Sequence, residues 1–298
     1  MPIIMLAAAV AAIAPPAWLY PQTMAAEPPP ASHEQISVPG SRVTVDAAIL
    51  HDRAQTVNWF PADQPAPPVR VLKAKAGEFA CGYCHMANGV GHPQNISIAG
   101  LNPDYVIAQF AAFRSGQRKA AQPGYIPNGS MTRVAGQVSD AEIAELANYY
   151  SKLPYRSLIR VRESEMVPNV RAAGLVWERV PGPPEPVAGR IIELMDRPED
   201  SIRHNPRGRS TAYVPPGSIA RGRRIAAELG CMACHVQMLG GWGPGRSPSY
   251  IVRQLLAFRN RARTDAGAEA MQPIADQLSL DDMVAVAAWM GAGAKASP

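Results

Sequence analysis

Two five-residue stretches, Cys81–His85 (CGYCH) and Cys231–His235 (CMACH), decide how the rest of the chain is interpreted. The chain has four cysteines, and these two stretches contain all of them. No thiol is therefore left over for a structural disulfide or for an isolated nucleophile. Whatever the cysteines do, they do it in pairs beside a histidine.

Cys-x-x-Cys-His is the attachment sequence of a c-type haem. On one helical turn the two sulfurs project to the same side, where each can form a thioether with a vinyl group of the porphyrin. The imidazole of the next residue then points at the iron, and a neutral imidazole is a good ligand for haem iron. The sequence therefore predicts two covalently bound haem c groups, with these attachment residues and proximal ligands: Cys81, Cys84, His85, Cys231, Cys234 and His235.

Two other uses of paired cysteines fit the sequence less well. A single zinc site would have to span the distance from Cys84 to Cys231, whereas the usual loop between two such pairs is about 15 to 20 residues long. A thioredoxin-like dithiol needs a βαβ context, which the helical flanks of the two motifs do not supply. Zinc would also leave the two adjacent histidines without a role.

The repeat extends beyond the two motifs. Residues 103–114 (PDYVIAQFAAFR) and 248–259 (PSYIVRQLLAFR) share Tyr, Gln, Phe and Arg in register. In both copies apolar residues recur at i, i+4 and i+7, as on one face of a helix. We therefore expect the same amphipathic helix in each half of the chain.

A matched pair of methionines follows. Met131 and Met271 each lie eight positions before a serine, and Ser139 and Ser279 each begin a Ser-x-x-acid capping signal ahead of an apolar periodic run. Their matching positions make these two methionines the candidates for the distal iron ligands, and the other methionines are interpreted as core residues. Four histidines have no counterpart in the other half and are expected at the surface: His33, His51, His92 and His204.

Composition limits the other functions of the chain. Its 298 residues are enough for about two domains of ordinary size. The 30 prolines are about twice the average usage, which favours long irregular connections between compact parts. The net charge is +5, but the 29 basic and 24 acidic residues are interspersed without a basic run. Nucleic acid is therefore not expected as a partner.

The N-terminal segment 1–26 resembles a secretory signal. Its apolar run to Ala14 is shorter than the about 20 residues that span a bilayer, but it suits the apolar region of a signal, and Ala25 and Ala26 offer a cleavage point. No basic residue precedes Arg42, so the usual positive start is missing. We expect export to the periplasm, with a buried apolar helix as the alternative, and membrane association only through this N-terminus or through a partner.

Each half of the chain resembles a class I cytochrome c domain, and the whole is similar to tandem two-haem cytochromes c. The resemblance rests on the attachment motif, the middle helix with Tyr-x-x-x-Gln, the distal Met, and Ser-Asp or Ser-Leu-Asp-Asp before the last helix. It implies a mainly α fold with two cytochrome c-type helical domains, joined by an irregular segment with a small β element. It also implies a carbonyl acceptor for each ligand histidine, at Ile96 in the first half and within residues 240–244 in the second.

The expected organisation has five parts. They are a signal-like segment (1–26), a Pro-rich arm that is extended over a domain or partly disordered (27–70), a first cytochrome c domain (71–153), a connecting segment with short strands near 158–163 and 173–180 (154–216), and a second cytochrome c domain (217–298).

An iron bound by His on one face and Met on the other has no open position for a substrate. The resemblance therefore implies an electron carrier without catalysis of its own, with His85 and Met131 on one iron and His235 and Met271 on the other. Expected partners are redox proteins: a dehydrogenase as donor, and an oxidase or another cytochrome as acceptor. Two alternatives stay open, a dedicated subunit of a dehydrogenase complex and a two-haem enzyme such as a peroxidase or a thiosulfate dehydrogenase.

The two halves also differ in their loops. The loop after His235 is five residues shorter than the loop after His85, and the loop before Met271 is five shorter than that before Met131. Less chain wraps the second haem, so we expect more water at its edge. Because water stabilises the ferric charge, the second haem is predicted to have the lower potential.

Overall fold

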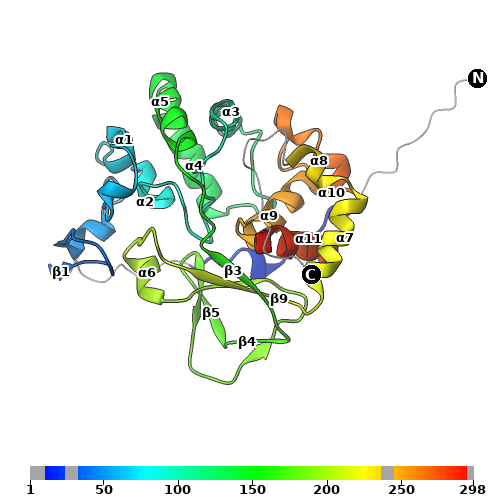
Figure 1. Ribbon diagram of the computed structural model, residues 1–298. Coiled ribbons are helices and arrows are strands. Elements are labelled where there is room, and N and C mark those ends of the chain that lie inside the picture. Colours follow the sequence, from blue (N-terminus) through cyan, green and yellow to red (C-terminus); the bar gives the residue numbers. More distant parts are fainter. Residues whose placement is uncertain (1–10, 24–32, 236–244, 294–298) are drawn as a thin grey trace, which may run out of the picture.

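The computed structural model describes residues 11–23, 33–235 and 245–293. Helices form most of its regular structure, and small sheets lie to one side of them (Figure 1). The longer helices are α3 (Pro103–Arg114), α4 (Ile126–Gln137), α5 (Asp140–Ser151), α7 (Ser218–Glu228), α9 (Pro248–Arg259) and α11 (Leu280–Ala292). The shorter ones are α1 (Val69–Leu72), α2 (Cys81–His85), α6 (Pro198–Ile202), α8 (Cys231–His235) and α10 (Gln272–Ala275).

The sequence repeat is also a structural repeat. Helices α3 and α9 both have 12 residues, and each starts with a proline after a side-chain cap, from Asn102 in the first and Ser247 in the second. Helices α5 and α11 both start with a complete capping box, which Ser139 and Ser279 begin. The helices predicted from the repeat, and their capping signals, are therefore confirmed.

Each half packs its own apolar core. In the first half Phe110 and Phe113 of α3 pack with Ile143 and Leu146 of α5. In the second half α7, α9 and α11 pack together, and Gly222 of α7 lies directly against the backbone of α11. A β-carbon at Gly222 would lie 1.9 Å from the carbonyl oxygen of Ala285, so only glycine permits this approach of the two helices.

The connecting segment is built around a three-stranded sheet. Strand β3 (Ile159–Glu163) pairs in parallel with β9 (Ser210–Val214), and β9 pairs antiparallel with β8 (Ile192–Met195). All of β9 is buried, because Ala212 and Val214 belong to the core of the second half while Tyr213 belongs to the segment's own cluster. The sheet is therefore fused to the second half rather than lying free between the halves.

The remaining strands of this segment form small pairs. Strand β4 (Met166–Val167) pairs with β7 (Glu185–Pro186), and β5 (Val170–Ala173) pairs with β6 (Val176–Arg179). The two strands predicted from the sequence correspond to β3 and β6. These two strands do not pair with each other. The partner of β3 is β9, a strand far along the chain that the sequence pattern does not predict.

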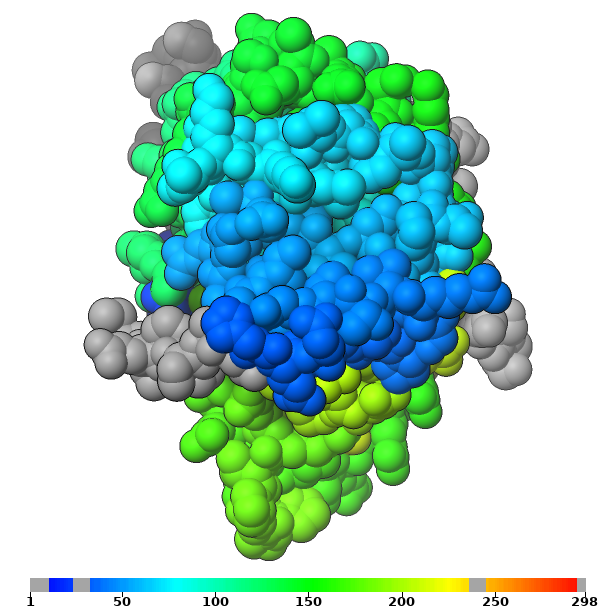
Figure 2. Space-filling model, turned by 90° about the vertical axis from the view of Figure 1, so that its left-hand side faces the viewer, coloured from blue at the N-terminus to red at the C-terminus, as the bar shows by residue number. Residues whose placement is uncertain are grey.

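The described part of the Pro-rich arm is folded against the connecting segment. It contains β1 (Gln35–Ile36), β2 (Val45–Asp46) and an apolar cluster around Trp59, which is 1% exposed. The indole of Trp59 donates to the carbonyl of Arg203 at 2.8 Å, and Asp63 pairs with Arg207 at 2.6 Å. Figure 2 shows these blue residues above the yellow-green ones of the connecting segment. The described residues of the arm are thus laid over the connecting segment and have an apolar core of their own.

Residues 11–23 also belong to the folded body. Leu19 is completely buried, and Ile13 exchanges two hydrogen bonds with Asn260. The rest of the signal-like segment, residues 1–10 and 24–26, lies outside the described residues. Within the described parts of the chain, no helix combines the length and apolar character needed to cross a membrane.

Candidate haem sites

The two attachment motifs form two short helices, α2 and α8, at equivalent positions of the repeat. In both α2 and α8 the helix starts at the first cysteine and ends at the histidine, so the two sulfurs lie one turn apart. The first helix is held closely by its surroundings. A β-carbon at Gly82 would lie 2.6 Å from the Thr56 side chain and 2.7 Å from the carbonyl oxygen of Val71.

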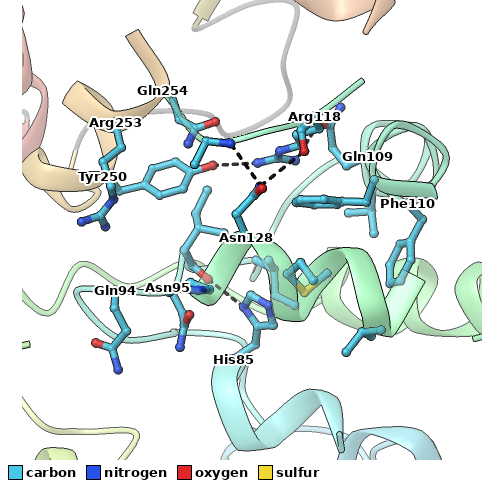
Figure 3. A pocket seen from close by; sticks show the side chains of 18 of the residues that line it. His85, Gln94, Asn95, Gln109, Phe110, Arg118, Asn128, Tyr250, Arg253 and Gln254 are labelled. Atoms are coloured by element: carbon cyan, nitrogen blue, oxygen red, sulfur yellow. Dashed lines mark hydrogen bonds between the residues drawn. The ribbon is translucent and has the colours of Figure 1, made fainter. Parts of the chain in front are cut away.

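The first motif opens onto a cavity. Cys81 and His85 lie on its wall, and Met131 of α4 lines the same cavity together with apolar side chains of α3 and α5. Figure 3 labels His85 and Phe110 among these lining residues. The structure therefore brings the predicted proximal and distal ligands of the first site to one cavity.

The imidazole of His85 has a defined orientation. Its Nδ1 lies 2.9 Å from the carbonyl oxygen of Ile96, the dashed line at His85 in Figure 3. An Nδ1–H that donates to this carbonyl leaves Nε2 with its lone pair for a metal ion. Burial lowers the pKa of His85, which favours the neutral form that binds iron. The acceptor expected at Ile96 is thus found.

The cysteines of the first motif do not have the electrostatics of a reactive dithiol. Burial raises the pKa of Cys81 to about 12 and that of Cys84 to about 11. Redox-active and metal-binding cysteines need the thiolate and therefore a lowered pKa. Among the described residues no group of three His, Cys, Asp or Glu side chains could hold a metal ion. The raised pKa values argue against the dithiol alternative.

The second motif opens onto a smaller cavity. Cys231, His235 and Met271 line it, so the second set of predicted ligands also meets at one cavity. Cys234 is exposed, whereas Cys84 is partly buried. The expected carbonyl acceptor for His235, within residues 240–244, lies outside the described residues.

The two cavities share a wall. Tyr250 and Gln254 of α9 line the first cavity, and Tyr105 of α3 lines the second together with Gln254. Figure 3 shows Tyr250 and Gln254 reaching toward the first cavity from the other half of the chain. The haem positions that these cavities define are therefore neighbours.

Two equivalent arginines connect the halves at this wall. Arg118 and Arg263 form a backbone bridge, and both are nearly buried. The guanidinium of Arg118 donates to the hydroxyl of Tyr250 at 2.9 Å, and that of Arg263 donates to Gln109 at 3.0 Å. Arg118 and Arg263 each lie four residues after the arginine that ends the repeated helix, and this matching position is the signal in the sequence for the contact.

Two of the histidines expected at the surface are partly buried. His92 and His204 lie with ring centroids 5.7 Å apart, and His204 packs edge-on against Tyr83 at 4.8 Å. Burial lowers the pKa of His92 to about 3 and that of His204 to about 4, so both are neutral. The surface prediction is wrong for this pair, because the connecting segment covers the loop that carries His92. His33 and His51 are exposed as expected.

The fold and the two cavities define a protein with two haem sites, and comparison with known proteins agrees. No family model matches the chain. Over 242 residues it is 25% identical to the thiosulfate dehydrogenase electron acceptor of Thiomonas intermedia, with 76% of this chain and 84% of that relative covered. Over 82 residues it is 35% identical to cytochrome c-554(548) of Halomonas halodenitrificans, with 26% of this chain and 93% of that relative covered.

Among solved structures, the reduced cytochrome c4 of Pseudomonas stutzeri is 18% identical, covers 72% of this chain and 93% of its own, and superposes with a TM-score of 0.45. Cytochrome c-554(548) is matched over almost its whole length, and the longer alignment extends over most of this chain. The chain belongs to the class I c-type cytochromes, as a tandem member that binds two covalent haem c groups.

Proposed function

We propose that the protein is an electron carrier whose two irons are each closed by one histidine and one methionine. The observation that carries this proposal is that each cavity is lined by its motif histidine and by the matched methionine. The proposed thioether residues are Cys81, Cys84, Cys231 and Cys234, the proposed proximal ligands are His85 and His235, and the proposed distal ligands are Met131 and Met271.

Such irons change oxidation state and nothing else. With both axial positions taken by the protein, no position is open for a substrate, and the soft thioether of methionine favours Fe(II) and raises the potential. The wall shared at Tyr105 and Gln254 supports electron transfer between the two haems of one molecule. We further propose that the two units are residues 71–153 and 217–298, supported by the separate cores of the two halves.

The proposed place of action is the periplasm, where covalent haem attachment and export coincide. The donor is a dehydrogenase and the acceptor an oxidase or another cytochrome, met through small and transient interfaces. One relative is named as the electron acceptor of a thiosulfate dehydrogenase. That name makes a thiosulfate dehydrogenase the first donor to test for this chain.

The test uses the holoprotein made with a haem-maturation system. Its mass should include two haem additions, and the oxidised protein should show the weak sulfur-to-iron band in the far red that methionine ligation produces. A purified thiosulfate dehydrogenase should reduce it in the presence of thiosulfate, whereas thiosulfate alone should not. Rapid and stoichiometric carbon monoxide binding at one haem, or thiosulfate oxidation by the protein alone, would support the enzyme alternative instead.

A further inference from the structure

Residues 11–23, here called the N-terminal strap, are bound along helix α9 of the second half. The backbone N–H of Ile13 donates to the side chain of Asn260 at 3.0 Å, and the Asn260 amide donates back to the carbonyl of Ile13 at 2.7 Å. Arg253, one of the buried arginines, donates to the carbonyl of Leu19 at 3.2 Å. The strap is therefore fixed to α9 near both of its ends.

The strap also reaches the other two parts of the molecule. Gln22 accepts a hydrogen bond from the backbone of Ile126 in the first half, at 2.8 Å. In the connecting segment, the indole of Trp177 donates to the carbonyl of Trp18 at 3.0 Å. Leu19 is fully buried, and full burial of such a side chain is worth about 1.5–3 kcal/mol. Loss of the strap would open the core of the second half.

One strap residue lines the first haem cavity. Tyr20 is 6% exposed and lies edge-on to Tyr125, with ring centroids 5.1 Å apart. Both rings line the cavity that contains His85 and Met131. Neither hydroxyl has a hydrogen-bond partner among the described residues. A buried hydroxyl without a partner costs about 1–3 kcal/mol, so two neighbouring ones indicate a polar ligand group between or beside them.

A haem supplies such a group. Its polar substituents are two carboxylates, which lie on the edge of the macrocycle opposite to the vinyl carbons that form thioethers. A haem whose thioether edge is held at Cys81 would have its carboxylate edge directed away from the attachment helix. The guanidinium of Arg253 lies 5.6 Å from the centre of the Tyr125 ring, so the same corner also carries a positive charge. Two hydroxyl donors and a nearby cation suit a carboxylate.

We propose that Tyr20 and Tyr125 donate hydrogen bonds to a carboxylate of the first haem, and that the N-terminal strap is retained in the mature protein as a wall of that site. This proposal rests on the assignment of the first haem to the cavity of His85 and Met131. It replaces the expectation that the chain is cleaved beside Ala25 or Ala26. Any cleavage then falls before the strap.

Retention of the strap is tested on the exported holoprotein. Digestion with a glutamate-specific protease should release a peptide that ends at Glu27 and contains Tyr20. A mature chain that begins at Ala26 or Glu27 would overturn the proposal. The same digest shows whether haem is attached to Cys81 and Cys84, so a failure of the haem assignment is distinguished from a failure of the strap.

The hydrogen bonds are tested with Tyr20→Phe and Tyr125→Phe, which keep both rings. Each variant should shift the propionate-bending band in the resonance Raman spectrum to lower frequency. It should also lower the potential of the first haem, because a less compensated carboxylate stabilises the ferric state. The wave of the first haem is the one that Met131→His displaces. Tyr213→Phe is the control, since Tyr213 is a buried tyrosine of the connecting sheet that lines neither cavity.

The two readouts decide the proposal together. Shifts in both Tyr20→Phe and Tyr125→Phe, with none in Tyr213→Phe, support hydrogen bonding to the haem. An unchanged band and an unchanged first-haem potential in both variants would contradict it, and the hydroxyls would then face only water.

Discussion

The two haem sites have the same proposed iron ligands but different walls. The first cavity is closed by the 12-residue helix α4, which carries Met131, and by the N-terminal strap. In the second, Met271 caps the four-residue helix α10, and the attachment cysteine Cys234 is exposed. The comparison separates two influences on the potential of a haem, because the proposed iron ligands are the same at both sites while the residues that cover each site differ. Any difference between the two potentials then reports mainly on the walls.

The largest expected effect comes from removing one haem at a time. Cys81→Ala with Cys84→Ala should lose one haem mass and the first-site signals, and Cys231→Ala with Cys234→Ala should lose the other. The first pair should lower the melting temperature more, because the first cavity is larger and is walled by both halves and by the strap. Mass spectrometry and thermal unfolding measure both effects. Equal melting temperatures of the two double variants would mean that the strap and the other residues that cover the first site are not stabilised by its haem.

Exchange of the distal ligand should be the next largest effect. Met131→His and Met271→His should each lower only the wave of its own haem in a redox titration, by on the order of 100 mV or more, since axial ligands set haem potentials over about 0.8 V. Each variant serves as the control for the other. In the wild type the lower wave is predicted to be the second haem. If Met271→His displaces the higher wave, the argument from solvent exposure is wrong.

A smaller effect is expected from the carbonyl that orients His85. Gly91 has φ of +69°, and a β-carbon there would lie 2.7 Å from the carbonyl oxygen of Ile96. Gly91→Ala should displace this acceptor and weaken the bond from His85, which makes the imidazole a weaker donor to ferric iron and raises the first-haem potential.

The matched control for Gly91→Ala is Gly77→Ala. Gly77 has a similar φ of +83°, but a β-carbon there meets nothing within 4 Å. Gly77→Ala should therefore show only the backbone cost of about 1–2 kcal/mol in denaturant unfolding, without a change in potential. A potential shift of the same size in both variants would show that backbone strain, and not the displaced carbonyl, is responsible.

The smallest effect concerns the wall between the sites. Tyr250→Phe removes the acceptor of one guanidinium nitrogen of Arg118 at 2.9 Å, while the other nitrogen keeps its bond to Gln109 at 2.6 Å. A buried N–H left without an acceptor costs about 1–3 kcal/mol. Tyr105→Phe, at the equivalent position of α3, is the control, because no hydrogen bond of its hydroxyl is found among the described residues. Denaturant unfolding should show the larger loss for Tyr250→Phe. Equal losses would indicate that Arg118 finds another acceptor when Tyr250 is changed.

The repeat made much of the helical structure predictable. The helices at 103–114 and 248–259 follow from local apolar periodicity and capping, which a single sequence contains. The acceptor for His85 at Ile96 was predicted from the resemblance to class I cytochromes c, which places a carbonyl acceptor in the loop after the motif. The pairing of β3 with β9 could not, since nothing in residues 159–163 specifies a partner about 50 positions away. Non-local pairing depends on the whole fold.

The same limit applies to the strap and to the buried histidines. An apolar run followed by small residues has a composition that fits both a secretory signal and a segment of the protein core. Only the position of Asn260 and Arg253 beside Ile13 and Leu19 distinguishes the two. His92 and His204 lie in segments that have no counterpart in the other half. Comparison of the two halves therefore could not predict that these two rings are in contact.

The distance along the chain between the strap and its partner has a consequence for the order of folding. Ile13 and Asn260 are separated by 247 positions, and contacts of such long range form late, because a large loop must close before they are made. In the proposed export to the periplasm, the first motif would emerge well before α9 does. The proposed first site would then not be complete until the C-terminal half arrives, and this delay would keep Cys81 and Cys84 accessible for haem attachment.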